Sequence, residues 1–486
     1  MVFANSANFR VFGEFYNIID GKITSTPSTT HNINPATGEA NPPVPLSRPK
    51  DVEDAVNAGK RAFKLWAKVP FAQRRMAALA FADAIEGHQE QFAKLLTQEQ
   101  GKSIPFAQGE VLATTGWIRV LADIELKDEI IEETDEKLTI TRYTPLGVAV
   151  GIVPWNFPIH ISCAKIIPAV LTGNPIIIKP SPFTPYCNLK LAELAQQFFP
   201  AGVVQALSGD DNLGPWLVAH PGIPKISFTG STVTGKKVLA SSSNEIKRVT
   251  LELGGLDPAI ICPDVNIQAI LPQVALAAFI NSGQLCMAIK RVYVHEDIYD
   301  EFLHALVEHT KQLKVGKGTD EDVFFGPVQN KVQYEKVKTF FDDFAREKAS
   351  LAMGGHNSTA KGYFINPTIV DRPSDTSRVA NEEVFGPVLP LMTWKTEDEV
   401  IFRANNTEMG LGASVWSADV ERANRIAEQL EAGSVWVNNH FEPNPKAALA
   451  AFKQSGLGSG AGLSGMREFC NPQTLYLRKV KQGSKL

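Results

Sequence analysis

Cysteine is scarce in this chain, and long apolar runs are absent. The 486 residues include five cysteines, an odd number whose spacing forms no paired framework. Secreted, disulfide-stabilised proteins carry many paired cysteines, so the sequence predicts a reducing compartment. Residues 1–10 hold no apolar stretch of the kind found in a secretory signal. No apolar run approaches the ~20 residues of a transmembrane helix, so we expect no membrane span.

An excess of one charge is missing as well. Lysine and arginine number 48 and aspartate and glutamate 52, which leaves a net charge of −4 without a basic stripe. Nucleic acid is therefore not an expected partner. With 44% hydrophobic and 21% charged residues, the composition is that of a globular protein. At roughly 100–200 residues per domain, the length predicts two to four domains.

Short apolar runs alternate with helical patterns after Pro145. Five strands are expected in this region, at 148–153, 175–178, 203–207, 226–229 and 249–253. Such strand–helix units build a mainly parallel sheet that binds ligands at the carboxyl ends of its strands. The pattern resumes after Gly254-Gly255, with strands at 259–262 and 291–295 and helices at 267–281 and 300–313. The predicted fold class is α/β.

Helices dominate the part of the chain before this region. Three are expected, at 51–68, 71–100 and 108–127, and Gly101 ends the second. Residues 132–143 alternate enough to predict an exposed ribbon. Residues 474–480 alternate weakly, which predicts a strand that joins a partner's sheet.

Three residues suit a reaction at a carbonyl carbon. Cys286 follows two small residues and a glutamine, and a thiolate attacks carbonyls readily, although a lone cysteine is more often buried and inert. Asn156 follows a strand, where its amide is placed to donate to a developing oxyanion. Glu252 ends an apolar strand, where a carboxylate is costly unless it is paired or acts as a general base.

Two strand ends suit a phosphate-bearing ligand. Gly230 and Ser231 lie where a strand meets a helix, so the backbone and the helix N-terminus favour an anion there, although an ordinary turn explains the same residues. Lys179 closes another strand at the same edge. Residues 460–465 match G-x-G-x-x-G, but too few residues follow for a strand–helix–strand unit, so we expect a tight turn there.

Six motifs in order resemble those of the aldehyde dehydrogenase superfamily, over about residues 30–480. They are Pro154-Trp155-Asn156-Phe157-Pro158, Lys179-Pro180-Ser181, Phe228-Thr229-Gly230-Ser231, Leu251-Glu252-Leu253-Gly254-Gly255, Gly283-Gln284-x-Cys286 and Glu382-Glu383-Val384-Phe385-Gly386-Pro387. The resemblance implies a Rossmann-type cofactor-binding domain (1–131 and 145–253) and an α/β catalytic domain (254–440). It also implies a small β oligomerisation arm with the C-terminal tail (132–144 and 441–486), in a homodimer or homotetramer.

The resemblance further implies a reaction. Cys286 would attack the aldehyde to give a thiohemiacetal, and Asn156 with the Cys286 N–H would stabilise the oxyanion. After hydride transfer, Glu252 would activate the water that hydrolyses the thioester. Lys165 matches a family lysine associated with proton movement. No metal is implied, and the cofactor site would be formed by Val153, Pro154, Trp155, Lys179, Gly230, Ser231, Leu253, Glu383 and Phe385.

Departures from the family pattern bear on cofactor and substrate. Pro182 replaces a glutamate that grips the adenosine ribose, which relaxes discrimination against NADP, whereas Asp210 and Asp211 disfavour its 2′-phosphate. NAD is therefore expected, with NADP as the alternative. Ala164 and Leu449 replace common aromatics, so an open apolar tunnel is expected for a medium-sized or bulky apolar aldehyde, formed by Phe157, Ile161, Ala164, Leu285, Met287 and Leu449.

Two other functions stay open. A CoA-acylating aldehyde dehydrogenase would pass the acyl group to CoA, although such relatives often lack the glutamate seen here as Glu252. A catalytically silent structural or binding protein is the other, and Asn156, Glu252, Cys286 and Glu383 together argue against it.

The last three residues predict a location. Ser484-Lys485-Leu486 is the peroxisomal import address, so we expect the import receptor as a partner and the peroxisome as the location. A cytoplasmic location follows if the address is not used.

Overall fold

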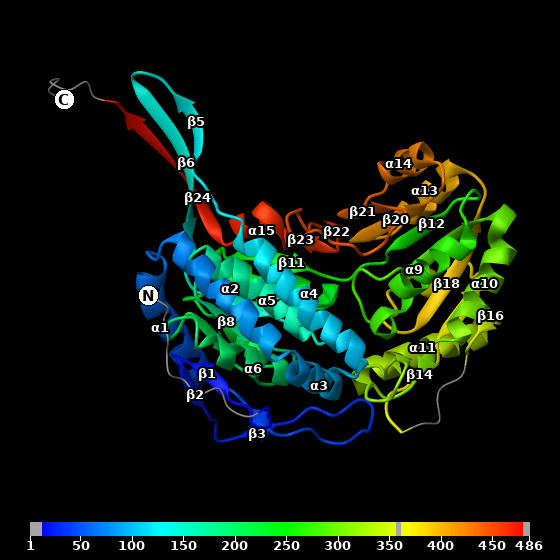
Figure 1. The fold of residues 1–486 in the computed structure, drawn as a ribbon, viewed down its shortest axis with the longest axis horizontal. Helices are drawn as coiled ribbons and strands as arrows, with labels where there is room; N and C mark the ends of the chain where they lie inside the picture. Colours follow the sequence, from blue (N-terminus) through cyan, green and yellow to red (C-terminus); the bar gives the residue numbers. More distant parts are fainter. Residues whose placement is uncertain (1–11, 356–360, 480–486) are drawn as a thin grey trace.

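The computed structural model describes residues 12–355 and 361–479. Two α/β lobes lie side by side, and a β arm projects from the first lobe near the end of the chain (Figure 1). Every helix in the described residues is too short or too polar to span a bilayer. The predicted import address, residues 484–486, lies outside the described residues.

The first lobe is built on a mainly parallel sheet. Its five central strands run parallel to one another, and the strand that pairs with each outer member of these five is antiparallel to it. One further strand, at the edge, pairs antiparallel with its neighbour. The order across the sheet is β2 (Lys22–Thr24), β1 (Asn17–Ile19), β9 (Val204–Ala206), β8 (Ile176–Lys179), β7 (Ala149–Ile152), β10 (Lys225–Thr229), β11 (Arg248–Glu252) and β23 (Gly456–Leu457).

Helices cover both faces of this sheet because its strands are apolar on both sides. Ile176 and Ile178 of β8 point into one hydrophobic core, and Ile177 points into the other. The first core holds α2 (Phe71–Gly87), α3 (Gln89–Gln100), α4 (Ile104–Ala122), α5 (Pro158–Leu171) and α6 (Tyr186–Ala195). The second holds α1 (Pro49–Trp66), α7 (Leu213–Ala219) and α8 (Thr232–Ser242).

The second lobe repeats this plan. Its sheet has the order β16 (Ser350–Met353), β17 (Thr368–Asp371), β18 (Val388–Trp394), β13 (Arg291–His295), β12 (Pro258–Ile261), β20 (Gly412–Trp416) and β21 (Ser434–Val437). One face packs against α9 (Ile267–Phe279) and α10 (Tyr299–Lys311). The other packs against α11 (Lys331–Glu347), α13 (Glu397–Asn405) and α14 (Val420–Ala427).

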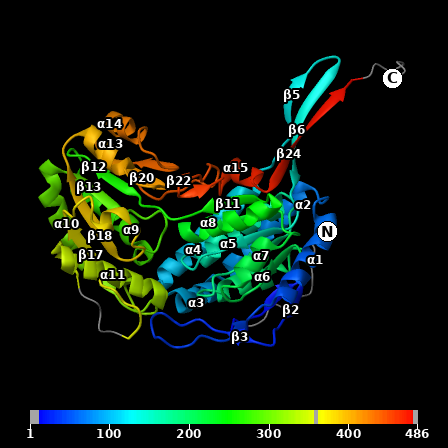
Figure 2. The same cartoon turned by 180° about the vertical axis from the view of Figure 1, so that it is seen from behind.

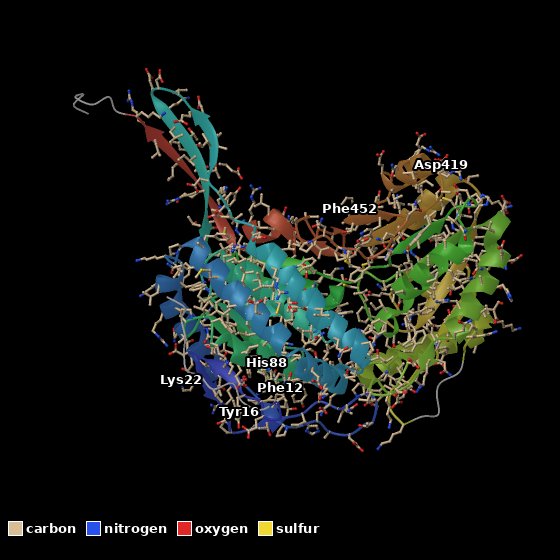
Figure 3. The ribbon with its side chains drawn as sticks, viewed as in Figure 1. Phe12, Tyr16, Lys22, His88, Asp419 and Phe452 are labelled. Carbon is tan, nitrogen blue, oxygen red and sulfur yellow. The ribbon has the colours of Figure 1, made fainter. Side chains whose placement is uncertain are left out.

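The predicted helix at 71–100 is wrong in one respect, since it is two helices. His88 leaves the helical conformation (φ −108°, ψ 20°) and separates α2 from α3. Phe12 lies beside His88 in Figure 3, with ring centroids 6.0 Å apart, and it also contacts Phe92 edge-on at 5.0 Å. These contacts come from a segment some 75 residues away, so local periodicity did not signal the break.

The arm differs from its predicted outline. It consists of β5 (Glu129–Glu133), β6 (Lys137–Pro145) and β24 (Cys470–Arg478), and β24 pairs with β6 of its own chain along nine residues. This strand therefore pairs within its own chain, and its joining a partner's sheet stays a prediction. The arm exposes Ile130, Ile131, Tyr476 and Leu477. Its role in joining copies of the chain stays a prediction.

Residues 441–469 do not belong to the arm, in contrast to the predicted outline. Between the lobes, β22 (Phe452–Lys453) pairs with β19 (Met409–Gly410), and β23 pairs with β11 of the first lobe (Figure 2). The helix α15 (Gly462–Arg467) follows, and its Met466 lies in the core of the first lobe. This segment therefore connects the two lobes and closes over the edge where β11 ends.

Candidate functional site

A strained turn presents Cys286. After α9 the chain forms the short helix η2 (Ile280–Gly283), in which Asn281 and Ser282 have left-handed φ angles of 52° and 56°. The surrounding chain holds this conformation, because Ser282 Oγ donates to the Gly326 carbonyl at 2.9 Å and Gln284 Nε2 donates to the Asn281 carbonyl at 2.9 Å. Non-glycine residues in this conformation cost of order 1–3 kcal/mol each and cluster at functional sites.

Cys286 lies where two cavities meet. One is a mainly apolar cavity of about 910 Å³, and the other is a cleft of about 600 Å³ between the lobes. Asn156, Thr229, Leu253 and Cys286 line both. The thiol is therefore reachable from two sides by two different molecules.

The structure places the six predicted tunnel residues around the apolar cavity. Phe157, Ile161 and Ala164 come from α5 and the turn before it, Leu285 and Met287 flank the thiol, and Leu449 closes the far side. Sequence reasoning missed further walls of this cavity, which are Trp117, His160, Leu411, Phe441 and Pro443. His160 lies on α5 beside the predicted Ile161, whereas the other four lie on segments whose local sequence does not mark them.

Asn156 faces the thiol from the first lobe. Its side-chain amide donates to the Gln284 carbonyl at 3.1 Å and is almost fully buried. The backbone N–H of Cys286 donates to no group within the described residues. These two N–H sources flank the thiol, which is the arrangement that stabilises an oxyanion formed on an attacked carbonyl.

A buried ion pair holds Asn156 in place. Lys102 Nζ donates to the Asn156 carbonyl at 2.9 Å and pairs with the carboxylate of Glu110, and both side chains are 1% exposed. The second Glu110 oxygen accepts from the N–H groups of Ile159 and His160, at 3.0 and 3.1 Å. Glu110 therefore caps α5, whose positive N-terminus favours a carboxylate, and fixes the turn that carries Asn156.

Glu252 lies on the apolar-cavity side of the thiol. One carboxylate oxygen accepts from Thr229 Oγ1 at 2.7 Å, and the Lys165 ammonium lies 3.7 Å from the same oxygen. Lys165 also donates to Thr229 Oγ1 at 2.7 Å and to Ser227 Oγ at 3.1 Å. Burial lowers the pKa of Lys165, and the charge of Glu252 opposes that effect.

Gly460 is a site residue that the sequence analysis assigned to a tight turn. It lines the apolar cavity, and a Cβ at this position would collide with the Glu252 carboxylate. The absence of a side chain therefore leaves room for the Glu252 carboxylate. Its G-x-G-x-x-G context is typical of a phosphate-binding turn, so no local pattern marks Gly460 as a neighbour of Glu252.

Most of the predicted cofactor residues line the cleft. Seven of them surround it, which are Pro154, Trp155, Gly230, Ser231, Leu253, Glu383 and Phe385. Val153 and Lys179 do not line this part of the cleft. Trp155 and Phe385 meet edge-on at 5.3 Å, and Phe385 is another left-handed residue (φ 55°).

The cleft has features that fit a nucleotide. Ser231 caps the N-terminus of α8, where unpaired N–H groups attract phosphate. The buried Lys179 ammonium donates to no group in the described residues, and burial lowers its pKa to about 8 against the charges of Asp211 and Asp210. A Cβ on Gly254 would lie 2.5 Å from Glu383 Oε2, so the glycine allows that carboxylate to reach the cleft.

The thiol itself is held in its neutral form by the site. Burial raises the pKa of Cys286 to about 12, and the charges of Glu383, Asp257 and Glu252 act in the same direction. The positive charge of Lys290 opposes them. A nucleophilic thiolate therefore depends on a nearby proton acceptor or on positive charge.

Known proteins match the chain along nearly its full length. The profile of the aldehyde dehydrogenase family matches residues 23–475. Aldehyde dehydrogenase LUC3 of a Fusarium species is 42% identical over 96% of this chain and 100% of its own. The NAD+ complex of an aldehyde dehydrogenase from Bacillus cereus superposes with a TM-score of 0.93 at 34% identity, covering 96% of each chain.

A second solved structure agrees. An indole-3-acetaldehyde dehydrogenase of P. syringae, in complex with NAD+ and IAA, superposes with a TM-score of 0.94 at 31% identity. The match covers 97% of this chain and 98% of the other. These structural matches confirm the predicted fold class.

Glu110→Gln should strongly destabilise the protein. The substitution leaves the buried Lys102 ammonium without its counter-charge, which typically costs about 3–5 kcal/mol. Denaturant unfolding followed by fluorescence measures the change. Glu90→Gln is the control, because its ion pair with Lys94 is exposed and its loss should leave the free energy of unfolding nearly unchanged. Equal stability of the two variants would contradict the assigned role of Glu110.

Proposed function

The chain belongs to the aldehyde dehydrogenase family, and we propose that it oxidises an apolar aldehyde to the carboxylic acid with NAD+ and water. Membership confirms the predicted family and an NAD(P)-dependent aldehyde-oxidising activity. The observation that carries the finer proposal is the position of Cys286 at the meeting point of two cavities. Glu252 lines the apolar cavity, and Glu383 lines the cleft.

The first step of the proposed reaction belongs to the thiol. Cys286 releases its proton to solvent, and its sulfur bonds to the aldehyde carbon. The carbonyl π bond opens, and its electron pair makes the oxygen the oxyanion of a thiohemiacetal. The Asn156 amide and the Cys286 N–H are the donors available to that oxyanion. NAD+, when bound, accepts the hydride that leaves the same carbon. Ser231, Lys179 and Glu383 are the residues that would hold it.

The second step belongs to Glu252. After hydride loss the carbon is a thioester, and water must attack it to release the acid. Glu252 accepts a proton from that water, the carbon–sulfur bond breaks, and the sulfur regains a proton. The bonds from Thr229 and the charge of Lys165 hold the carboxylate on this side of the thiol.

Charge near Lys179 favours NAD+ over NADP+. Asp210 and Asp211 act electrostatically on the Lys179 ammonium. They already supply negative charge at this end of the site, so the 2′-phosphate of NADP+ would be repelled. Pro182 leaves the ribose hydroxyls without the usual acceptor, so the preference for NAD+ is expected to be modest.

The walls of the cavity support an apolar substrate. Trp117, Phe157, Ile161, Met287 and Phe441 are among its lining side chains. No lysine or arginine is among the described residues that line it, so a carboxylate on the substrate would find no ion pair.

Cys286→Ala should abolish NADH formation, because no sulfur remains to carry the acyl group. Glu252→Gln should release one equivalent of NADH per site and then turn over about 10²-fold more slowly or worse, because deacylation loses its base. Stopped-flow absorbance and mass spectrometry of the acyl-enzyme measure both. Cys262→Ala, in the second-lobe core, is the control. Persistent turnover of Cys286→Ala would sink the nucleophile assignment.

Ala164→Trp should narrow the cavity and act on large substrates selectively. A change in the shape of an apolar pocket typically alters kcat/KM by about 10–200-fold. The kcat/KM for long or aromatic aldehydes should therefore fall by about this factor. Acetaldehyde should be affected little. Kinetics on an aldehyde series measure the effect, with Ala72→Trp on an exposed helix face as the control. A uniform loss across the series would contradict the assigned substrate site.

We propose that the protein is imported into peroxisomes through Ser484-Lys485-Leu486. Deleting Leu486 should leave a fluorescently tagged chain in the cytosol, because the receptor reads the terminal tripeptide. The intact chain should co-localise with a peroxisomal marker. Unchanged import of the truncated chain would reject the proposal.

A further inference from the structure

Lys290 is a buried lysine that the reaction outlined above does not use. It directly precedes β13, and its side chain is 8% exposed. Its ammonium donates to the carbonyl oxygens of Leu285 at 2.9 Å and Cys286 at 2.6 Å. It also lies 3.1 Å from Glu383 Oε1. One ammonium therefore contacts both the backbone carbonyl of Cys286 and a carboxylate of the cofactor cleft.

The backbone of Lys290 is held by hydrogen bonds within the second lobe. The N–H groups of Lys290 and Arg291 donate to the Asp257 carbonyl at 2.9 and 3.2 Å. Arg291 Nε donates to the Leu256 carbonyl at 3.0 Å. The lysine therefore reaches back from a rigid strand to the end of the turn that carries the thiol. Buried carbonyl oxygens need a hydrogen-bond donor, and the Lys290 ammonium donates to two of them.

Charges on several elements act on the thiol. Glu383, Asp257 and Glu252 disfavour its thiolate, and Lys290 favours it. Lys336 of α11 donates to the Glu383 backbone carbonyl at 2.8 Å. The charge of Lys290 also helps to lower the pKa of the buried His440. Lys290 is thus the positive charge set against three carboxylates around Cys286.

We propose that Lys290 is a positioning residue that ties the turn carrying Cys286 to Glu383 and favours the thiolate through its charge. The inference rests on the proposed function, in which Cys286 is the nucleophile and Glu383 belongs to the cofactor cleft. It goes beyond that function, because it assigns the positive charge that offsets the cost of forming a thiolate in a buried site.

Opposite effects of two neutral substitutions follow from a charge-based role. Lys290→Met keeps the length of the side chain and removes the charge, which should lower the thiolate fraction. Glu383→Gln keeps the shape and removes the opposing charge, which should raise it. Lys290→Arg keeps the charge and should restore most of the wild-type behaviour. If Lys290 acts only through packing, both neutral variants should lower the rate at which the Cys286 thiol reacts.

The experiment is alkylation of Cys286 by iodoacetamide between pH 7 and 9.5 without cofactor, with modification at Cys286 counted by mass spectrometry. In this range the rate follows the thiolate fraction, and a shift of one pKa unit is about tenfold. Lys290→Met should be alkylated about tenfold more slowly than wild type, and Glu383→Gln faster by a few-fold. Lys290→Arg should lie within about threefold of wild type on the same scale.

Two outcomes would overturn the proposal. If Lys290→Met is alkylated at the wild-type rate, the charge of Lys290 has no effect on the thiolate. If both neutral variants are alkylated more slowly, the role of Lys290 is limited to packing. Unfolding curves for each variant identify any rate change that comes from loss of structure. The measurement needs no turnover, so it stands even if Cys286→Ala shows that the proposed reaction is wrong.

Discussion

The constraint on which this site depends is the cost of forming a thiolate inside a protein. Burial raises the pKa of Cys262, Cys286 and Cys470 alike, to about 12. Burial therefore does not distinguish Cys286, the proposed nucleophile, from the other two. What distinguishes Cys286 is that it lines two cavities and lies beside Lys290, Glu252 and Glu383. The rest of the site supplies a proton acceptor, a positive charge and hydrogen-bond donors to a thiol that is otherwise inert.

The segments that hold the thiol in place lower the stability of the fold. Asn281, Ser282 and Phe385 keep left-handed backbones, and a Cβ on Gly283 would collide with the Gly386 carbonyl. These residues belong to two segments that press against each other beside the thiol. Lys102 and Glu110 add a fully buried ion pair, whose desolvation offsets much of its attraction. Left-handed residues and a buried ion pair are therefore part of the structure that holds the thiol and Asn156 in place.

Local patterns predicted much of this molecule. Apolar runs such as Ile176–Ile178 marked the parallel strands, because both faces of those strands are covered by helices. The residues at the strand ends, among them Glu252 and Ser231, were found because ligands bind at that edge. What local patterns missed depends on contacts between distant segments. Phe12 packs against His88 where two helices meet, Gly460 makes room for Glu252, and Lys290 reaches back to Glu383.

The two lobes contribute different groups to the candidate site. Glu252 and Asn156 belong to the first lobe, and Cys286, Lys290 and Glu383 belong to the second. Glu252 lines the apolar cavity and not the cleft, whereas Glu383 lines the cleft and not the apolar cavity. The carboxylate proposed to activate water and the carboxylate proposed to hold the cofactor therefore line different cavities, and the thiol lines both. Because the two carboxylates serve opposite sides of one sulfur atom, hydride transfer and hydrolysis need not compete for the same space.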